Sequence, residues 1–447
     1  FMLTHYTLAG DELNLSAYFG YQEVFYKNAV DAKNLELDFK LDDDAYLNVL
    51  LENKHDTLTG IRISNNAKFP NIVFQVFHGE FIRKTNLPQF KLDENWNALE
   101  LVFANDETTI SLNGKPYENI FSRSLSVNAI GFRGNAYASF IDNISFFDNK
   151  TQSLITEDFE NPDSIWPQIL ISLFIIVLFI VLQINFQQKL ELLSLGTFSF
   201  TFICVILWGA YVLKFQHIYL PLWTINWHGL ESTIEDSAAV NDRIQKIISS
   251  KTNNSDTKIL FIGSSQTWGA GASTTENTFV HRFENLVNAH DTTESVTCIN
   301  TGISGLTSTE LFKFYQEKWI SAAPKVVIIN LSNNDISEDK LRKNMQRFID
   351  LNEKRNIKTL LILEPNDEDN EGLLLKHEVI RSLAKENNIA CIDMHKELLK
   401  HYDDGFLFWD FVHLTDFGQK LFAEILFEAY QKETQQTILP KLEAAPR

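Results

Sequence analysis

From residue 258 onward, short apolar runs alternate with longer amphipathic stretches five times. Each run has the length of a strand that is buried on both faces, and each stretch after it has helical periodicity. This alternation predicts a parallel sheet with helices on both faces, in which ligands bind beyond the carboxyl ends of the strands. The predicted strands are 258–262, 296–300, 326–330, 359–363 and 389–393, and the predicted helices are 275–289, 309–319, 338–356, 372–387 and 416–431.

A serine-containing turn follows the first of these predicted strands. The apolar run ends in Gly263, then Ser264 and Ser265 follow, and Gly269 closes the turn before the first helix. A serine on a sharp strand-to-helix turn presents its hydroxyl to a substrate, although Gly and Ser also cluster in ordinary loops. A serine hydroxyl becomes a good nucleophile only beside a base, so a catalytic Ser265 needs a partner elsewhere in the chain.

The partner that the sequence offers is His413, just before the last predicted helix. Asp410 precedes it by three residues, so its carboxylate can reach the Nδ1–H, hold the tautomer and stabilise the imidazolium. An isolated Asp-x-x-His segment is more often a surface turn before a helix. Among the 11 histidines, only His413 has this arrangement at the predicted strand-end face. Ser265, His413 and Asp410 together predict a Ser-His-Asp triad.

Acyl transfer through a triad also needs hydrogen-bond donors for the oxyanion that forms on the carbonyl oxygen. The backbone N–H of Ser265 is one candidate. Gly305, after the second predicted strand, can present a second N–H with no side chain in the way, and the Asn334 amide, after the third strand, is another. Each loop alone is more often an ordinary turn. Their common position at strand ends predicts an oxyanion hole.

These segments resemble the SGNH (GDSL-type) hydrolase family over residues 256–435. The resemblance implies a flavodoxin-like three-layer α/β sandwich of five parallel strands, and ester chemistry by Ser265, Asp410 and His413. It also implies an oxyanion hole of Ser265, Gly305 and Asn334, and a reaction without metal or cofactor. The segments that match the family's four blocks are, in order, 263–269, Gly305, 332–335 and the pair Asp410 and His413.

Two residues depart from the family's pattern. Ser264 stands where the family has an acidic residue before the nucleophile, and Ser332 stands where its third block has glycine. Neither change removes a triad residue or an oxyanion donor. The departures therefore bear on substrate and rate more than on mechanism.

Residues 1–158 have another pattern, in which short alternating runs follow one another without helices between them. Alternation with a period of two is typical of half-buried strands, and the Asn-Gly pair at 113–114 predicts a tight turn. Many short strands at even spacing predict a two-sheet β-sandwich. The predicted strands are 35–41, 72–77, 96–103, 108–112 and 141–147.

The order of these strands, with the late Trp-x-x-Leu-x-Leu, Asn-Gly and Ile-Asp-Asn-Ile segments, resembles concanavalin-like (laminin-G-like) jelly-roll domains. The resemblance implies a lectin-like domain that binds glycan. A structural or spacer sandwich explains the pattern equally well.

Two uncharged stretches, 164–188 and 192–213, lie between these regions. Each is long enough to cross about 30 Å of hydrocarbon as a helix, and buried core helices of this length rarely lack charge. They predict a two-helix transmembrane hairpin at 164–214, followed by a linker at 215–255, with a tail at 436–447. A weak bias of basic residues places both domains outside the cytoplasm, in a bacterial periplasm or at a cell surface.

Composition narrows the classes of partner. A formal net charge of −19 argues against nucleic acid, which needs clustered Lys and Arg. The three cysteines are widely spaced, so they suggest neither a disulfide framework nor a zinc site.

The function that we expect is a membrane-tethered serine esterase that removes O-acyl (acetyl) groups from an envelope or extracellular carbohydrate. Trp268 and Trp409 are possible substrate contacts because indole faces stack on sugars, although core packing is the commoner role of tryptophan. One alternative is an O-acyltransferase acting on a glycan, which would need an acyl-donating partner. Another is a non-catalytic glycan-binding membrane protein.

Overall fold

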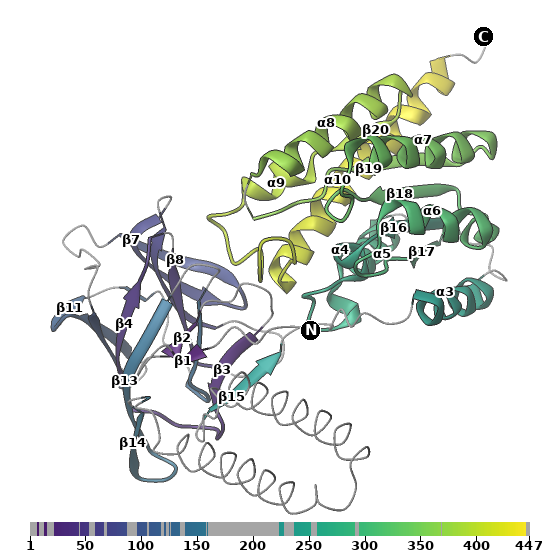
Figure 1. The fold of residues 1–447 in the computed structure, drawn as a ribbon. Helices are drawn as coiled ribbons and strands as arrows, with labels where there is room; N and C mark the ends of the chain where they lie inside the picture. Colours follow the sequence, from purple (N-terminus) through teal and green to yellow (C-terminus); the bar gives the residue numbers. More distant parts are fainter. Residues whose placement is uncertain are drawn as a thin grey trace, which may run out of the picture.

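The structure is a computed structural model in which an all-β domain and an α/β domain lie side by side (Figure 1). It describes residues 7–8, 13–15, 22–43, 45–52, 59–66, 69–86, 96–104, 107–117, 120–121, 125, 127–134, 139–157, 159, 223–227, 237–251, 257–290, 295–367 and 369–443.

The α/β domain is built on a sheet of five parallel strands in the spatial order β17-β16-β18-β19-β20. The central strand β18 is buried along its whole length, as a sheet covered on both faces requires. When the five strands are numbered in chain order, their spatial order across the sheet is 2-1-3-4-5, which is the flavodoxin-like arrangement. The strands are β16 (Thr257–Gly263), β17 (Val296–Asn300), β18 (Val326–Asn330), β19 (Lys358–Ile362) and β20 (Ala390–Ile392).

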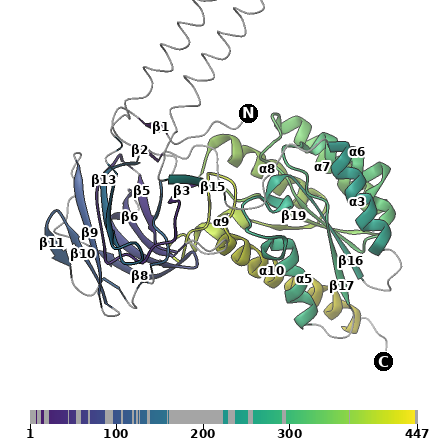
Figure 2. The ribbon, with the colours of Figure 1, turned by 90° about the horizontal axis from the view of Figure 1, so that it is seen from below.

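Helices cover both faces of this sheet, which gives three layers (Figure 2). On one face α3, α6, α7 and α8 share an apolar core with the strands, and on the other α5, α9 and α10 share a second. The helices are α3 (Ser237–Lys251), α4 (Ser265–Trp268), η2 (Thr275–Asn277), α5 (Phe279–His290), α6 (Ser308–Glu317), η3 (Trp319–Ala322), α7 (Glu338–Lys354), α8 (Glu371–Glu386), α9 (Met394–Leu399) and α10 (Asp416–Glu443).

The predicted α/β pattern is confirmed, and every predicted strand matches the observed one to within one residue at either end. The helix predicted at 275–289 is divided, because Thr278 is extended between η2 and α5. Sequence patterning missed α9, whose six residues are too few for a helical period to be recognised.

The all-β domain consists of two antiparallel sheets. We name them sheet A, with the order β1-β2-β13-β4-β9-β10-β11 and β14 paired to β13, and sheet B, with the order β15-β3-β12-β5-β6-β7-β8. The strands of sheet A are β1 (Thr7–Leu8), β2 (Leu13–Asn14), β4 (Asn34–Leu41), β9 (Asn97–Ala104), β10 (Glu107–Leu112), β11 (Lys115–Tyr117), β13 (Ser139–Asp148) and β14 (Ser153–Glu157). Those of sheet B are β3 (Gln22–Tyr26), β5 (Tyr46–Leu50), β6 (Gly60–Asn66), β7 (Phe69–Phe77), β8 (Glu80–Asn86), β12 (Gly131–Arg133) and β15 (Trp223–Trp227).

One apolar core lies between the two sheets. Phe39 of sheet A, and Val49 and Phe132 of sheet B, are among its fully buried members. The predicted two-sheet sandwich is therefore present in the described residues. The predicted tight turn is present too, since Asn113 and Gly114 join β10 to β11 with φ values of 51° and 73°. The likeness to jelly-roll lectins stays a prediction.

The stretch 215–255, predicted as a linker, contributes to both domains. Its strand β15 pairs with β3 at the edge of sheet B, although the two strands are far apart in the chain. Its helix α3 packs on the sheet of the α/β domain, where Val240, Ile244 and Ile248 join the apolar core. The chain therefore returns to the sandwich before it enters the α/β domain.

The predicted transmembrane hairpin is corrected by the structure. No helix among the described residues combines the length and the apolar character needed to cross a bilayer. The described fold is a β-sandwich joined to an α/β domain without a membrane-spanning hairpin, and the stretch 164–214 lies outside the described residues. The placement of both domains outside the cytoplasm, argued from charges around that stretch, stays a prediction.

Candidate active site

The serine turn is set by close packing between β16 and the helix that follows it. A Cβ at Gly263 would lie 1.9 Å from the Oγ1 of Thr267, so this position requires glycine. The chain then enters the one-turn helix α4 and leaves it at Gly269, which has a left-handed φ of 99°. Ser265 is therefore the first residue of a helix directly after a strand end, as its predicted role requires.

The structure brings the three predicted triad residues into one hydrogen-bonded chain. The Nε2 of His413 lies 2.9 Å from the Oγ of Ser265, and its Nδ1 lies 2.7 Å from the Oδ2 of Asp410. The side chains of His413 and Asp410 are 17% and 6% exposed, so most of this chain is shielded from bulk water. When Nδ1–H donates to Asp410, Nε2 keeps a lone pair that can accept the serine proton.

Residues 410–413 form a turn around the Asp410 carboxylate. Its Oδ1 accepts hydrogen bonds from the N–H groups of Val412 and His413, at 2.8 and 2.7 Å. Burial raises the pKa of Asp410, but its electrostatic interaction with His413 and the hydrogen bonds from His413 and Val412 outweigh burial, so the pKa lies below its ordinary value. Asp410 is therefore an ionised acceptor that can orient the imidazole.

The loops that carry the predicted oxyanion donors are in contact. Gly305 lies between β17 and α6 with a φ of 75°, and open space surrounds the position of a Cβ. Asn334 follows β18, and its Nδ2 donates to the carbonyl of Leu306 at 3.1 Å. An amide has two N–H donors, so this bond leaves Asn334 with a second one. The structure thus brings the loops of Gly305 and Asn334 together.

A second glycine, which the sequence reasoning missed, joins the Gly305 loop to the serine turn. A Cβ at Gly302 would lie 2.2 Å from the backbone nitrogen of Trp268, and the N–H of Ile303 donates to the carbonyl of Gly263 at 3.1 Å. Such close backbone contact is what glycine permits. The sequence signal that could have revealed Gly302 is its position two residues after the end of the second predicted strand.

A buried carboxylate, also missed, links the serine turn to the Asn334 loop. Glu364 is fully buried, and its Oε2 accepts from the N–H groups of Ser332 and Asn333 at 2.5 and 2.6 Å. Two side-chain hydroxyls, those of Ser332 and Ser264, also donate to this carboxylate, at 3.0 and 3.3 Å. Ser264 and Ser332, the two departures from the family pattern, thus bind the same acid. The sequence signal that could have revealed Glu364 is its position directly after the fourth predicted strand.

Gln266, the residue after the predicted nucleophile, is a further positioning group that sequence reasoning missed. It is only 1% exposed, and its Nε2 donates to the carbonyls of Pro365 and Val412 at 2.6 and 2.8 Å. Val412 lies inside the turn formed by Asp410 and His413. The Gln266 amide therefore fixes the histidine turn relative to the serine turn.

The two candidate tryptophans have different environments. Trp409 is 7% exposed, and its Nε1 donates to the carbonyl of Gly271 at 2.7 Å, so its indole packs inside the protein and is not placed to stack on a sugar. Trp268, at the end of α4, is half-buried, and the guanidinium of Arg243 lies 4.2 Å from its ring centre. Only Trp268 remains a candidate substrate contact.

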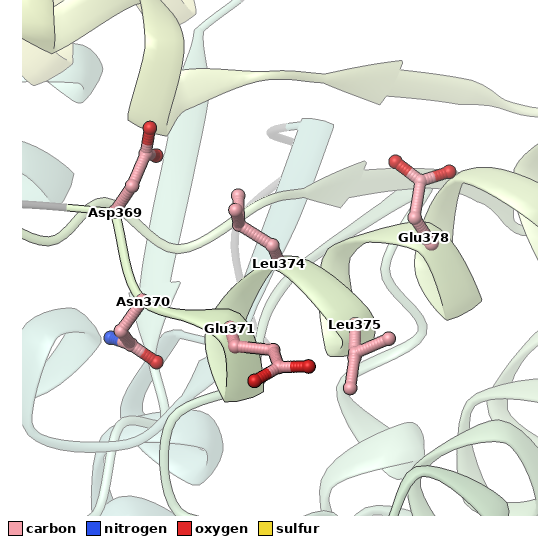
Figure 3. A pocket seen from close by; sticks show the side chains of 6 residues that line it. All are labelled: Asp369, Asn370, Glu371, Leu374, Leu375 and Glu378. Carbon is pink, nitrogen blue, oxygen red and sulfur yellow. The ribbon is translucent and has the colours of Figure 1, made fainter.

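The described residues contain no cluster of three or more His, Cys, Asp or Glu side chains with the geometry of a metal site. A separate surface pocket lies at the beginning of α8, where three acidic side chains and two leucines line it (Figure 3). None of the predicted site residues lines this pocket. Its lining residues are Asp369, Asn370, Glu371, Leu374, Leu375 and Glu378.

Comparison with known proteins places the site in context. Residues 261–421 match the GDSL-like Lipase/Acylhydrolase family. Solved structures similar to this chain include an acetyl xylan esterase (27% identity, 38% of this chain, 98% of that chain, TM-score 0.35) and one from Geobacillus stearothermophilus (22%, 39%, 95%, 0.35). A lipase/acylhydrolase from Enterococcus faecalis is also similar (20%, 40%, 96%, 0.36). A search of curated proteins found no significant match.

Proposed function

We propose that this chain, a serine esterase whose C-terminal half is a GDSL-type hydrolase domain, removes O-acyl groups, acetyl foremost, from a carbohydrate. The observation that carries the chemistry is the continuous chain from the Ser265 Oγ through His413 to Asp410, with distances of 2.9 and 2.7 Å. A triad is recognised by this geometry and by the roles of its members, not by their order in the sequence.

In the proposed reaction, Nε2 of His413 accepts the proton of Ser265 as the Oγ attacks the ester carbonyl. The imidazolium is stabilised by the buried carboxylate of Asp410 and then gives its proton to the sugar oxygen as its bond to the acyl carbon breaks, so that the sugar leaves as an alcohol. This leaves an acyl group on Ser265. Water, deprotonated by His413, attacks the acyl-enzyme and releases the free acid and the serine.

The proposed oxyanion hole consists of the N–H groups of Ser265 and Gly305 and the side-chain amide of Asn334. Backbone and amide donors that are already fixed stabilise the oxyanion without reorganising at the moment of reaction. The support for this role is the close packing of the loops, in which Asn334 contacts Leu306 and Ile303 contacts Gly263.

A carbohydrate substrate is supported by the surroundings of Ser265. Trp268 lies three residues after the serine, and a sugar would stack on the part of its half-buried ring that Arg243 and the neighbouring apolar cluster leave uncovered. The segment 365–372, which follows the buried Glu364, is polar and acidic and lacks the apolar character of a lipase lid. The SGNH resemblance also includes enzymes that act on acetylated sugars.

A second candidate, an ester with a longer acyl chain, is favoured by two exposed apolar side chains. Ile336 is 96% exposed, two residues after Asn334, and Phe411 is 43% exposed, directly after Asp410. Exposed apolar side chains on two active-site loops would provide contact for an alkyl chain. Both candidates use the same triad and differ only in what binds beside it.

The first experiment is labelling of the full chain with a fluorophosphonate, comparing wild type with Ser265→Ala by intact mass. We expect one adduct on wild type and none on the variant. An unlabelled, folded wild type would overturn the assignment of Ser265 as an activated nucleophile.

The second experiment separates the candidate substrates. Release of acetate from acetylated oligosaccharides and hydrolysis of p-nitrophenyl acetate, butyrate and octanoate are compared at equal concentration. Highest kcat/KM on the acetyl substrates supports the carbohydrate proposal, and a steady rise with chain length supports the second candidate. Transfer of acyl groups to an added glycan faster than acid appears would instead indicate an acyltransferase.

A further inference from the structure

The outer face of sheet B packs against the segment that leads into the histidine turn. An apolar cluster there joins Tyr46 and Phe81 of the sandwich to Phe406 and Trp409 of the α/β domain. Two arginines of sheet B, Arg62 and Arg133, are buried in the same place, at 6% and 0% exposure. The interface therefore contains two guanidinium groups that have been removed from water.

The guanidinium of Arg133 is directed at the main chain of the α/β domain. Its Nη2 donates a hydrogen bond to the carbonyl of Trp409, and its Cζ lies 4.5 Å from the centre of the indole ring of the same residue. Trp409 is the residue directly before Asp410. Arg133 thus acts on the peptide unit that carries the orienting acid of the triad.

Trp409 is held from three directions. Its carbonyl accepts from Arg133, its N–H donates to the carbonyl of His413 at 2.8 Å, and its indole N–H donates to the carbonyl of Gly271 at 2.7 Å. The first bond comes from the sandwich, the second closes the turn that contains Asp410 and His413, and the third reaches the segment after the serine turn. Loss of the hydrogen bond from Arg133 would free one side of the turn that contains Asp410 and His413.

Sheet B holds Arg133 in place through its neighbours. Arg133 lies opposite Asn48 of β5, whose Nδ2 donates to the Arg133 carbonyl at 3.3 Å. The Oδ1 of Asn48 accepts from the Nε of Arg62 at 2.8 Å, and the Arg62 guanidinium lies 4.4 Å from the ring centre of Phe406. Arg133 is therefore fixed by the strand register and by a second buried arginine.

Backbone pairing between the domains fixes the same segment further upstream. The N–H of Phe81 donates to the carbonyl of Asp404 at 2.9 Å, and the N–H of Phe406 donates to the carbonyl of Gly79 at 2.7 Å. A Cβ at Gly405 would lie 2.7 Å from the Gly79 carbonyl oxygen, so these two backbone segments approach as closely as glycine allows. The turn between β7 and β8 thus pairs with residues 404–406 as a neighbouring strand would.

We propose that Arg133 is a positioning residue of the esterase, and that the sandwich holds the Asp410–His413 turn in its reactive geometry through it. If the residue at position 133 served only to pack the interface, an apolar side chain would be more stable there, because burying a cation without partners costs free energy. A guanidinium that donates to the peptide before Asp410 instead fixes where that acid lies. This inference depends on the serine esterase chemistry and is independent of the acyl group and the sugar.

The test replaces Arg133 by methionine in the full chain, which keeps an apolar stem and removes the donors. We expect kcat on p-nitrophenyl acetate and the rate of fluorophosphonate labelling of Ser265 to fall by about 100-fold, as a misplacement of about 1 Å can cause. KM should stay within about threefold, because substrate contacts are unchanged. Arg133→Lys, which keeps the charge but not the planar fork, should lose at least about fivefold and lie between methionine and wild type.

The control is Lys84→Met, which removes an exposed charge from the rim of the same interface, where Lys84 lies 3.6 Å from Asp403. Its labelling rate should equal that of wild type. Wild-type labelling in Arg133→Met, with only the Tm lowered, would overturn the proposal and leave Arg133 a stabilising residue. If Arg133→Met does not fold, Arg133→Lys decides by the same criterion. Absence of labelling in wild type would instead contradict the esterase assignment.

Discussion

The two sheets of the sandwich share one core but differ in what covers their outer faces. On sheet A, the outward residues of β4 alternate with the core, and Glu36 is exposed while Lys40 is half-buried. On sheet B, Asn48 and Arg62 occupy the equivalent outward positions and are 3% and 6% exposed. At β4, sheet A is an ordinary half-buried sheet, whereas at β5 and β6 sheet B is buried on its outer side as well.

The difference indicates how the sandwich serves the enzyme. A module that moved independently of the catalytic domain would keep an exposed polar outer face on both sheets. Sheet B instead buries two arginines and forms main-chain hydrogen bonds with residues 404–406. These buried groups and hydrogen bonds hold the two domains together, which favours a sandwich that is part of the catalytic unit, whether or not it also binds glycan.

The largest expected effect lies at the triad to which the interface leads. Asp410→Asn should lower kcat by about 10⁴-fold, because the amide can hold the wrong tautomer of His413 and cannot stabilise the imidazolium. The measurement is hydrolysis of p-nitrophenyl acetate, with circular dichroism to show that the variant is folded. A loss of less than about tenfold would remove Asp410 from the triad, and the interface would then lead to no catalytic group.

The next largest effect is expected at Glu364, a polar group buried inside the α/β domain, which can be compared with the arginines buried at the interface. Glu364→Ala leaves the N–H groups of Ser332 and Asn333 without their acceptor, and we expect a loss of about 3–5 kcal/mol of unfolding free energy. Displacement of the Asn334 loop should also lower kcat by about 100-fold. Glu364→Gln, which keeps an acceptor oxygen, is the matched control and should retain most of both. Equal losses in the two variants would contradict this role.

The same residue gives a pH dependence. Burial raises the pKa of Glu364, with the hydrogen bonds from Asn333 and Ser332 opposing it. The folded state then holds the proton to higher pH than the unfolded chain, so this contribution to stability is full below the ordinary glutamate pKa of about 4.3 and is lost as pH rises through the folded pKa. Relative to Glu364→Gln, wild type should lose stability over that window in denaturant titrations. A constant difference would contradict the raised pKa.

At sheet B, Arg62→Ala should destabilise the protein by about 2–4 kcal/mol. The variant loses a charge-assisted bond to Asn48, contacts with the rings of Tyr46 and Phe406 at 3.8 and 4.4 Å, and buried volume. Urea unfolding measures the change. A loss below about 0.5 kcal/mol would show that the face of sheet B is no more constrained than an ordinary surface.

The sequence predicted most of the α/β domain because its strands are buried on both faces and its helices are long. The hydrogen-bonded chain of Ser265, His413 and Asp410 was predictable for a related reason: the three residues lie in short segments whose local chemistry is distinctive. Gln266 and Glu364 were missed because their partners, the carbonyl of Val412 and the N–H groups of the Asn333 loop, are distant in sequence. No spacing rule connects such residues before the fold is known.

The interface could not be predicted for a similar reason. Arg62 and Asn48 lie at outward positions of alternating strands, where a polar residue is what a solvent-facing surface also requires. Trp409, expected beside the substrate, is instead covered by Arg133 from a strand that precedes it by 276 residues. Alternation predicts which residues leave the core of a sandwich, but it cannot predict what covers them.

The smallest expected effect completes the comparison with Arg62. Lys40 also points outward from a central strand and also lies over an aromatic ring, at 5.8 Å from the ring centre of Phe140, but among the described residues the α/β domain does not pack on it as it does on Arg62. Lys40→Ala should therefore change the unfolding free energy by less than about 0.5 kcal/mol, because a cation–π contact of a half-buried lysine that water still reaches is weak and screened. Urea unfolding of Lys40→Ala and Arg62→Ala in parallel isolates the contribution of the covering domain. Equal losses at the two sites would mean that burial under the α/β domain adds nothing to the contact, and the distinction between the two sheets would not hold.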